Sequence, residues 1–179
     1  MPNSPSVSFP SASPEPASRA YVLDSFALFA YFGNEQGADL VTQLLEHGAE
    51  DAQLSLSIIN LGELMYATER ERGKEEATSR LADVHRLPIT LVGVTEQRVL
   101  AAARIKAKHA VSYADAFAVA LAQELNAVIV TGDPEFQSVE KIVDILWLRE
   151  VAAKGKPARE KQARERRTAY RVTSRRKRA

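Results

Sequence analysis

The sequence predicts an α/β domain in which a parallel β-sheet is covered by helices on both faces, a three-layer α/β/α arrangement. Two observations lead to this fold class. Short apolar runs rich in β-branched residues, such as Val128-Ile129-Val130-Thr131, are typical of buried strands. They alternate with longer segments, such as 96–108, whose residue pattern is typical of helices. Strands that alternate with helices favour a parallel sheet, because each helix returns the chain to the start of the next strand.

The predicted elements follow one another in a regular order. Strands are expected at 21–23, 54–58, 89–94, 128–131 and 142–148. Helices are expected at 26–32, 38–47, 60–72, 75–85, 96–108 and 112–125. Gly33 is suited to end the first helix, and Asn60 and Ser112 are suited to start two later ones. The turn sequence Gly132-Asp133-Pro134 closes the fourth strand.

The two ends of the chain differ in composition from its middle. Residues 1–19 contain five prolines and six serines, so we expect a disordered leader. Residues 1–150 hold 12 Lys and Arg against 21 Asp and Glu, a charge of −9, whereas residues 151–179 hold 12 against 2, a charge of +10. We therefore expect a single domain at 20–149, followed by a basic tail at 150–179.

The composition excludes several classes of function. The chain of 179 residues contains no cysteine, which excludes disulfides, thiolate zinc sites, iron–sulfur clusters and thiol nucleophiles. The N-terminus lacks the pattern of a signal peptide, and no apolar run approaches the roughly 20 residues that span a bilayer. These features predict a soluble protein of the cytoplasm without a membrane partner.

Four carboxylates are predicted to meet at one edge of the sheet. Asp24 and Asp133 follow the ends of two strands, and Glu63 and Asp115 lie in the first turns of helices. Ligands bind outside the carboxyl ends of strands in open parallel sheets, and helices that follow strands start at the same edge. Each acid also has a local explanation: Asp24 as a helix cap, Glu63 and Asp115 as members of capping boxes, and Asp133 as a turn residue.

Taken together, the four acids indicate a metal site. Carboxylates brought to one edge repel each other unless a cation lies among them. Oxygen ligands without neighbouring His or Cys favour Mg²⁺ or Mn²⁺ over zinc. Such an ion binds phosphate oxygens and lowers the pKa of a bound water, so hydrolysis of phosphodiesters is the natural chemistry.

At these acids the sequence resembles the PIN domain family and, within it, the VapC-type ribonuclease toxins of toxin–antitoxin pairs. The resemblance covers about residues 20–148, and the order and spacing of its segments are more specific than any one of them. The segments are Val22-Leu23-Asp24-Ser25, Asn60-Leu61-Gly62-Glu63-Leu64, Ser112-Tyr113-Ala114-Asp115-Ala116 and Thr131-Gly132-Asp133-Pro134-Glu135-Phe136. Typical members are more compact, so the leader and the basic tail depart from the pattern.

The resemblance implies a PIN-like parallel sheet and an endoribonuclease that depends on Mg²⁺ or Mn²⁺. It implies cleavage of RNA by metal-activated water, which leaves a 5′-phosphate. It also implies a homodimer and a cognate antitoxin protein that inserts a peptide near the active site. The family's catalytic acids fall on Asp24, Glu63, Asp115 and Asp133, with the three aspartates as metal ligands. The hydroxyls of Ser25 and Thr131 match positions that support the acidic site.

The sequence leaves alternatives for several basic residues, for the histidines and for the function. Arg104, Lys106 and Lys108 end a predicted helix, where cations either oppose the helix dipole or contact the RNA backbone. The histidines, His47, His85 and His109, lie far apart in sequence, which weakens a metal-independent mechanism based on histidine. The alternative function is a non-catalytic PIN-fold module that binds RNA or protein through its basic tail, and a metal titration distinguishes it from the nuclease.

Overall fold

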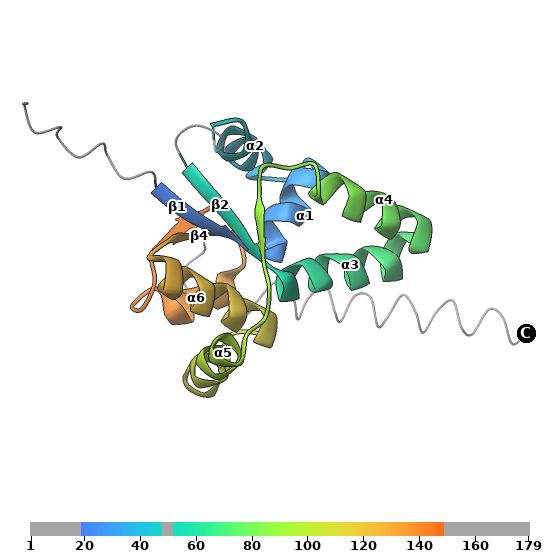
Figure 1. Ribbon diagram of the computed structural model, residues 1–179. Helices are drawn as coiled ribbons and strands as arrows, with labels where there is room; N and C mark the ends of the chain where they lie inside the picture. The colour runs from blue at the N-terminus through green and yellow to red at the C-terminus, as the bar shows by residue number, and fades with distance from the viewer. Residues whose placement is uncertain (1–18, 48–51, 149–179) are drawn as a thin grey trace, which may run out of the picture.

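The computed structural model describes residues 19–47 and 52–148. The strands are β1 (Arg19–Leu23), β2 (Ala52–Ser57), β3 (Thr90–Val92), β4 (Val128–Thr131) and β5 (Ile145–Trp147). The helices are α1 (Ser25–Gly33), α2 (Ala38–His47), α3 (Ile58–Arg72), α4 (Lys74–Val84), α5 (Glu96–Lys108) and α6 (Tyr113–Leu125), together with the 3-10 helix η1 (Pro134–Val139). Strands and helices alternate along the chain as predicted (Figure 1). Residues 1–18 of the predicted leader and the predicted basic tail lie outside the described residues, whereas Arg19, assigned to the leader, is the first residue of β1.

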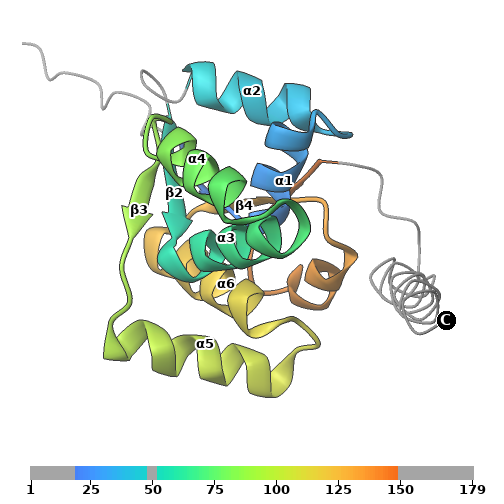
Figure 2. The same ribbon diagram turned by 90° about the vertical axis from the view of Figure 1, so that its right-hand side faces the viewer.

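The strands form one sheet in the order β3-β2-β1-β4-β5, and every neighbouring pair is parallel. Helices α1 to α4 pack on one face of the sheet, and α5 and α6 pack on the other (Figure 2). The predicted three-layer α/β/α arrangement is therefore confirmed. None of the helices in the described ranges has the length and apolar sequence needed to cross a membrane.

Successive residues of the central strands point into opposite cores. Val22 and Ile129 are buried with α5 and α6, whereas Leu23 and Val130 are buried with α1 to α4. This alternation follows from the two-residue period of a strand, and burial on both faces explains why these strands are apolar runs. With the sheet held from both sides, its carboxyl edge is a rigid place to present side chains.

The structure corrects the predicted start of α3. Ser57, not Asn60, is the N-cap, and its hydroxyl accepts a hydrogen bond from the backbone N–H of Ile59 at 3.2 Å. The helix therefore begins at Ile58, which was predicted to belong to the preceding strand. Asn60 lies inside the first turn, and Glu63 lies one turn later than predicted. The capping box expected between Asn60 and Glu63 does not form.

Two further differences concern the C-terminal part of the domain. The segment after Asp133 was predicted only as a turn, but it continues as the six-residue 3-10 helix η1. Pro134 at its first position has the backbone angle and the missing N–H that suit a helix start. The last strand is shorter than the predicted range 142–148, because only Ile145–Trp147 pair with β4.

Candidate active site

The four predicted acids lie at the carboxyl edge of the parallel sheet. Asp24 follows β1 directly, Asp133 follows β4 after one glycine, Glu63 lies on the helix after β2, and Asp115 lies in the first turn of α6. All four are buried, with exposed fractions of 1%, 9%, 7% and 2%, respectively. Carboxylates are rarely buried to this degree without a partner that stabilises their charge.

Thr131 joins Asp24 to Asp133. The Oδ1 atom of Asp24 accepts a hydrogen bond from the N–H of Ala27 at 2.8 Å, which caps α1. Its Oδ2 atom accepts a bond from the hydroxyl of Thr131 at 2.7 Å. The same hydroxyl oxygen accepts a bond from the N–H of Asp133 at 3.0 Å. One threonine at the end of β4 thus fixes the first acid against the segment that carries the last.

Ser25 and Tyr66 hold Glu63 from two helices. The hydroxyl of Ser25, the first residue of α1, donates to Oε2 of Glu63 at 2.5 Å. The hydroxyl of Tyr66, one turn further along α3, donates to Oε1 at 3.4 Å. Tyr66 was not predicted from the sequence, although the three-residue spacing from Glu63 places the two side chains side by side on a helix.

The remaining two aspartates also cap helices. Ser112 and Asp115 form the predicted capping box of α6, with bonds of 3.0 Å and 3.1 Å between each side chain and the other residue's N–H. Asp133 caps η1 by accepting a bond from the N–H of Glu135 at 2.9 Å. The local explanation is therefore right for Asp24 as a cap and for Asp115 as a member of the capping box whose N-cap is Ser112, whereas Asp133, predicted as a turn residue, is the N-cap of η1. It does not exclude metal binding, because a carboxylate offers about four acceptor sites and a cap uses only one.

The electrostatics indicate that the acids form one cluster. Burial raises the pKa of Asp24 well above its ordinary value, and the nearby carboxylates of Asp115 and Asp133 raise it further. Burial also raises the pKa of Asp115 to about 6, with contributions from Asp133 and Glu63, although hydrogen bonds within the capping box act in the opposite direction. Each of the four acids thus interacts with at least one other.

The donor set fits a hard divalent cation. It consists of carboxylate oxygens on a rigid edge, and the negative charges of this cluster are costly without a cation. Across residues 19–47 and 52–148, however, no group of three or more acidic or histidine side chains has its ligand atoms already gathered for a metal. Binding of an ion would therefore require the carboxylates of the cluster to turn towards one another.

Asn60 is the most unusual polar residue near the cluster. Its side chain is fully buried, and neither Oδ1 nor Nδ2 has a hydrogen-bond partner within the described part of the chain. It lies one turn before Glu63 on the same side of α3. Asn60 was predicted to be a helix cap, so its burial was not expected. An orphaned buried amide is destabilising and requires an explanation.

Gly132 allows α1 to approach the end of β4. A Cβ atom at this position would clash with the ring of Phe26, so no larger residue fits without movement. Phe26 belongs to the first turn of α1, beside Asp24 and Ser25, and Gly132 directly precedes Asp133. This close contact fixes the distance between two of the segments that carry the acids.

The other predicted residues lie away from the acids or already have partners. Lys106 donates to the carbonyl of Val111 at 2.6 Å, so it holds the loop before α6, and Lys108 is an exposed end of α5. The ring of His109 contacts the carbonyl of Ser138 at 2.8 Å. His85 is exposed, and the side chain of His47 lies outside the described residues. No predicted histidine whose side chain is described contacts the four acids.

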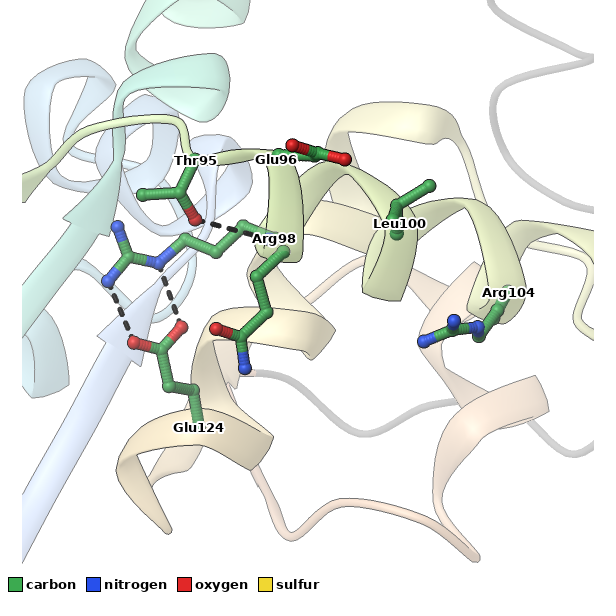
Figure 3. Close-up of a pocket in the computed structure, with 7 residues that line it drawn as sticks. Thr95, Glu96, Arg98, Leu100, Arg104 and Glu124 are labelled. Atoms are coloured by element: carbon green, nitrogen blue, oxygen red, sulfur yellow. Dashed lines mark hydrogen bonds and ion pairs between the residues drawn. The ribbon is translucent and has the colours of Figure 1, made fainter.

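Arg104 lines a separate surface pocket between α5 and the end of α6 (Figure 3). In this pocket the guanidinium of Arg98 forms two hydrogen bonds with the carboxylate of Glu124, at 2.7 Å and 2.8 Å. None of the four acids lines the pocket. The predicted contact of Arg104 with RNA therefore gains no support from proximity to the carboxylate cluster.

Comparison with known proteins identifies the family. The PIN domain profile matches residues 21–142, so the chain belongs to the PIN domain family. None of the curated proteins searched matches the chain significantly. Similar solved structures include VapBC2 from Rickettsia felis bound to a promoter DNA fragment, which is 18% identical with a TM-score of 0.58. That match covers 71% of this chain and 97% of the other.

Two further structures show the same fold. VapBC-1 from nontypeable Haemophilus influenzae is 21% identical with a TM-score of 0.56, and the match covers 73% of this chain and 99% of the other. VapC20 from Mycobacterium tuberculosis, described as a toxin that cleaves the Sarcin-Ricin loop, is 16% identical with a TM-score of 0.56. That match covers 66% of this chain and 94% of the other.

Proposed function

We propose that the protein is a metal-dependent endoribonuclease and the toxin of a type II toxin–antitoxin pair. The observation that carries this proposal is the convergence of Asp24, Glu63, Asp115 and Asp133, all buried and mutually repulsive, at the carboxyl edge of a PIN domain. A cluster of this kind destabilises the fold, and such destabilisation is characteristic of functional sites. Mg²⁺ or Mn²⁺ is the class of ligand that would relieve it.

In this proposal the acids have different roles. Asp24, Asp115 and Asp133 would hold the ion, which would neutralise phosphate charge and favour ionisation of a water molecule. Glu63 would orient the attacking water and accept its proton, because Ser25 and Tyr66 hold both of its oxygens in place. Thr131 would position Asp24 and Asp133 without contacting the substrate.

The choice of RNA and of an antitoxin partner rests on the structural neighbours. VapC20 is described as a toxin that cleaves the Sarcin-Ricin loop, and another neighbour is described as a toxin–antitoxin complex from Klebsiella pneumoniae. We propose by analogy that this chain cleaves RNA, binds a cognate antitoxin and forms a homodimer in the cytoplasm. We further propose that the basic tail at 150–179, together with Arg104, Lys106 and Lys108, strengthens binding to the RNA backbone.

The test of catalysis uses the full chain purified free of metal. Wild-type protein should cleave RNA only when Mg²⁺ or Mn²⁺ is added, and the products should carry 5′-phosphates. The Asp115→Asn variant keeps the capping ability of residue 115 but loses its charge, so it should remain folded and inactive. Cleavage in excess chelator, or products with cyclic phosphate ends, would contradict the mechanism. Metal binding without any cleavage would favour the non-catalytic alternative.

The test of the tail compares the full chain with a truncation after Arg149. RNA affinity is measured across a salt series, and each phosphate contact steepens the salt dependence by about 0.7 for single strands. The truncated protein should bind more weakly at low salt and with a smaller slope, while its cleavage rate at saturating RNA stays the same. Equal affinity and equal slope in both proteins would rule out RNA binding by the tail.

A further inference from the structure

The described chain ends at the edge of the sheet that carries the acids. The backbone N–H of Leu148, the residue after β5, donates to the carbonyl of Thr131 at 2.8 Å. The hydroxyl of Thr131 in turn donates to Oδ2 of Asp24 at 2.7 Å. Leu148 is buried, and it packs so closely on the backbone of Gly37 that a Cβ atom at residue 37 would clash with it. The chain therefore leaves the described domain at a fixed point beside the acid cluster, which consists of Asp24, Glu63, Asp115 and Asp133.

The acid cluster and the basic tail complement each other in charge. Residues 151–179 carry a charge of +10, against −9 for residues 1–150. Within the ranges 19–47 and 52–148, no Lys or Arg forms an ion pair with Asp24 or Asp115. Asn60, one turn before Glu63, adds a buried amide oxygen that receives no hydrogen bond from a described residue. A need for positive charge and a need for a donor thus occur together, and an arginine side chain supplies both.

The length of the tail permits its return to the edge from which it starts. Lys154 is the first cation of residues 151–179, and an extended chain from Leu148 to this residue spans up to about 20 Å. The entropic cost of closing a loop grows only slowly with its length, so the later cations can also return. A group tethered in this way has an effective concentration of about 1 mM. A contact that is weak between separate molecules is therefore largely formed within one chain.

We propose that cationic side chains of the basic tail bind at the acid cluster of the same chain when no metal ion is present, so that the tail is an internal inhibitor which the ion displaces. The inference rests on the proposed function and adds a regulator of the same site. Displacement by the ion frees the tail to contact RNA, so its inhibitory role and its role in RNA binding belong to two states of the protein. At saturating metal and RNA the tail leaves the cleavage rate unchanged.

The first test measures Mn²⁺ binding without RNA, by calorimetry at low salt, for the full chain and for a truncation after Arg149. The truncation removes no residue of a described strand or helix. It should lower the Kd for Mn²⁺ about tenfold, because a competitor with a Kd of about 0.1 mM and an effective concentration of about 1 mM weakens binding by this factor. At about 1 M salt, where the Debye length is about 3 Å, the difference should vanish. Equal Kd values at low salt, or a difference that high salt leaves unchanged, would overturn the inference.

The second test locates the contact with a fluorescein-labelled peptide of residues 150–179, whose anisotropy is followed as truncated protein is added. The peptide should bind with a Kd of about 0.1 mM. Asp115→Asn should weaken this binding about threefold. Glu124→Gln removes one carboxylate from the other end of α6 and is the matched control, so it should leave the Kd unchanged. No binding, or equal weakening by both substitutions, would overturn the inference, because the second result means a general attraction to an acidic surface.

The two tests separate this inference from the proposed function, because neither uses RNA or cleavage. A wild-type protein that fails to cleave RNA contradicts the proposed ribonuclease, while the binding measurements still decide the role of the tail. Metal-dependent cleavage together with equal Mn²⁺ affinities of the full and truncated chains rejects the inhibitor and leaves the ribonuclease proposal intact. If neither chain binds Mn²⁺, the proposed metal dependence is wrong, and the peptide titration alone decides the inference.

Discussion

The acidic residues of this domain fall into two sets with opposite surroundings. On the outer surfaces of α4 and α6, Glu76, Asp83 and Glu124 form an outer set whose members each pair with an arginine at 2.7 to 3.2 Å. The pKa of Glu124 is accordingly lowered by Arg98. At the carboxyl edge, by contrast, Asp24 and Asp115 form no ion pair with any described residue, and their pKa values are raised by burial and by other carboxylates.

The first set consists of charges that stabilise the folded state slightly, whereas the second set consists of charges that destabilise it. Exposed ion pairs contribute little to the free energy of unfolding, about 0 to 1 kcal/mol each, so we expect their removal to change stability very little. Buried carboxylates that repel one another lower stability, so their presence calls for a role outside folding. Substitutions of individual acids in the two sets test this difference.

The largest expected effect is on catalysis. Asp24→Asn and Asp115→Asn should each lower the RNA cleavage rate by at least ~100-fold, because a ligand to the metal contributes several kcal/mol to the transition state. Both variants should unfold at the same denaturant concentration as the wild type or higher, since the cap is kept and a repulsive charge is removed. The control Glu124→Gln, from the outer set, should keep full activity. Normal cleavage by either aspartate variant would remove it from the site.

The second effect is on the pH dependence of stability. The pKa of Asp115 is about 6 in the folded protein, against about 3.9 in an unfolded chain. The folded state therefore binds more protons between these values, and its stability falls as pH rises from about 4 to about 6. In chelator the loss from this residue should be about 3 kcal/mol, measured by denaturant unfolding across pH.

The same experiment distinguishes the two sets of acids. Asp115→Asn should flatten the pH profile in this window. Glu124, whose pKa is lowered, stabilises the fold above its unfolded pKa and loses that contribution as pH falls, which is the opposite sign. Because Glu124 is exposed, Glu124→Gln should hardly alter the profile. A wild-type profile that rises steadily from pH 4 to pH 7 would contradict the assigned environment of Asp115.

The Asn60→Leu variant tests whether the buried amide near the carboxyl edge of the sheet lowers stability while it contributes to function. Removing an orphaned buried amide should raise the free energy of unfolding by about 1 to 3 kcal/mol. Cleavage should nevertheless fall, because we expect the amide to form hydrogen bonds with water molecules that hydrate the acid cluster. Asn126, the left-handed cap of α6, is the matched control. Asn126→Leu should destabilise by about 1 to 2 kcal/mol, with no change in the cleavage rate. Destabilisation by Asn60→Leu would mean that the amide is structural.

The smallest expected effects are changes in stability at Gly132 and Gly62, the two glycines that directly precede Asp133 and Glu63. Gly132→Ala places a Cβ atom against Phe26 and should destabilise by about 1 to 3 kcal/mol. It should also lower activity by shifting Asp133 relative to α1. Gly62 has open space around it on an exposed turn of α3, so Gly62→Ala should stabilise by about 0.5 to 1 kcal/mol. Thermal unfolding of both variants measures these opposite changes.

The order of strands and helices was predictable in part because burial on both faces made β1 and β4 apolar runs. The convergence of the acids was also predictable, since parallel strands bring their carboxyl ends to one edge. The start of α3 was not. Ser57 and Asn60 are both good caps, and the intervening Ile58 and Ile59 are β-branched, so the local sequence favoured a longer strand.

The supporting contacts of the site were predictable only in part. Ser25 and Thr131 were identified through a family resemblance, but their bonds to Glu63 and Asp24 span 38 and 107 positions of the chain. Tyr66 was not identified, and Asn60 was interpreted only as a helix start, because the roles of both residues depend on exposure and burial, which the sequence does not specify. Local patterns predict elements, whereas partners across the sheet edge come only from tertiary packing.

The central claim is that the acid cluster is a cation site, and metal-dependent unfolding tests it most directly. At pH 7.5 the melting temperature of metal-free wild type is measured as Mg²⁺ or Mn²⁺ is added, with Asp115→Asn and Glu124→Gln in parallel. A ligand present at 100 times its Kd stabilises the native state by about 2.7 kcal/mol. We predict a saturable rise for wild type and Glu124→Gln, and little or no rise for Asp115→Asn. The same rise in all three proteins, or none in the wild type, would contradict the claim.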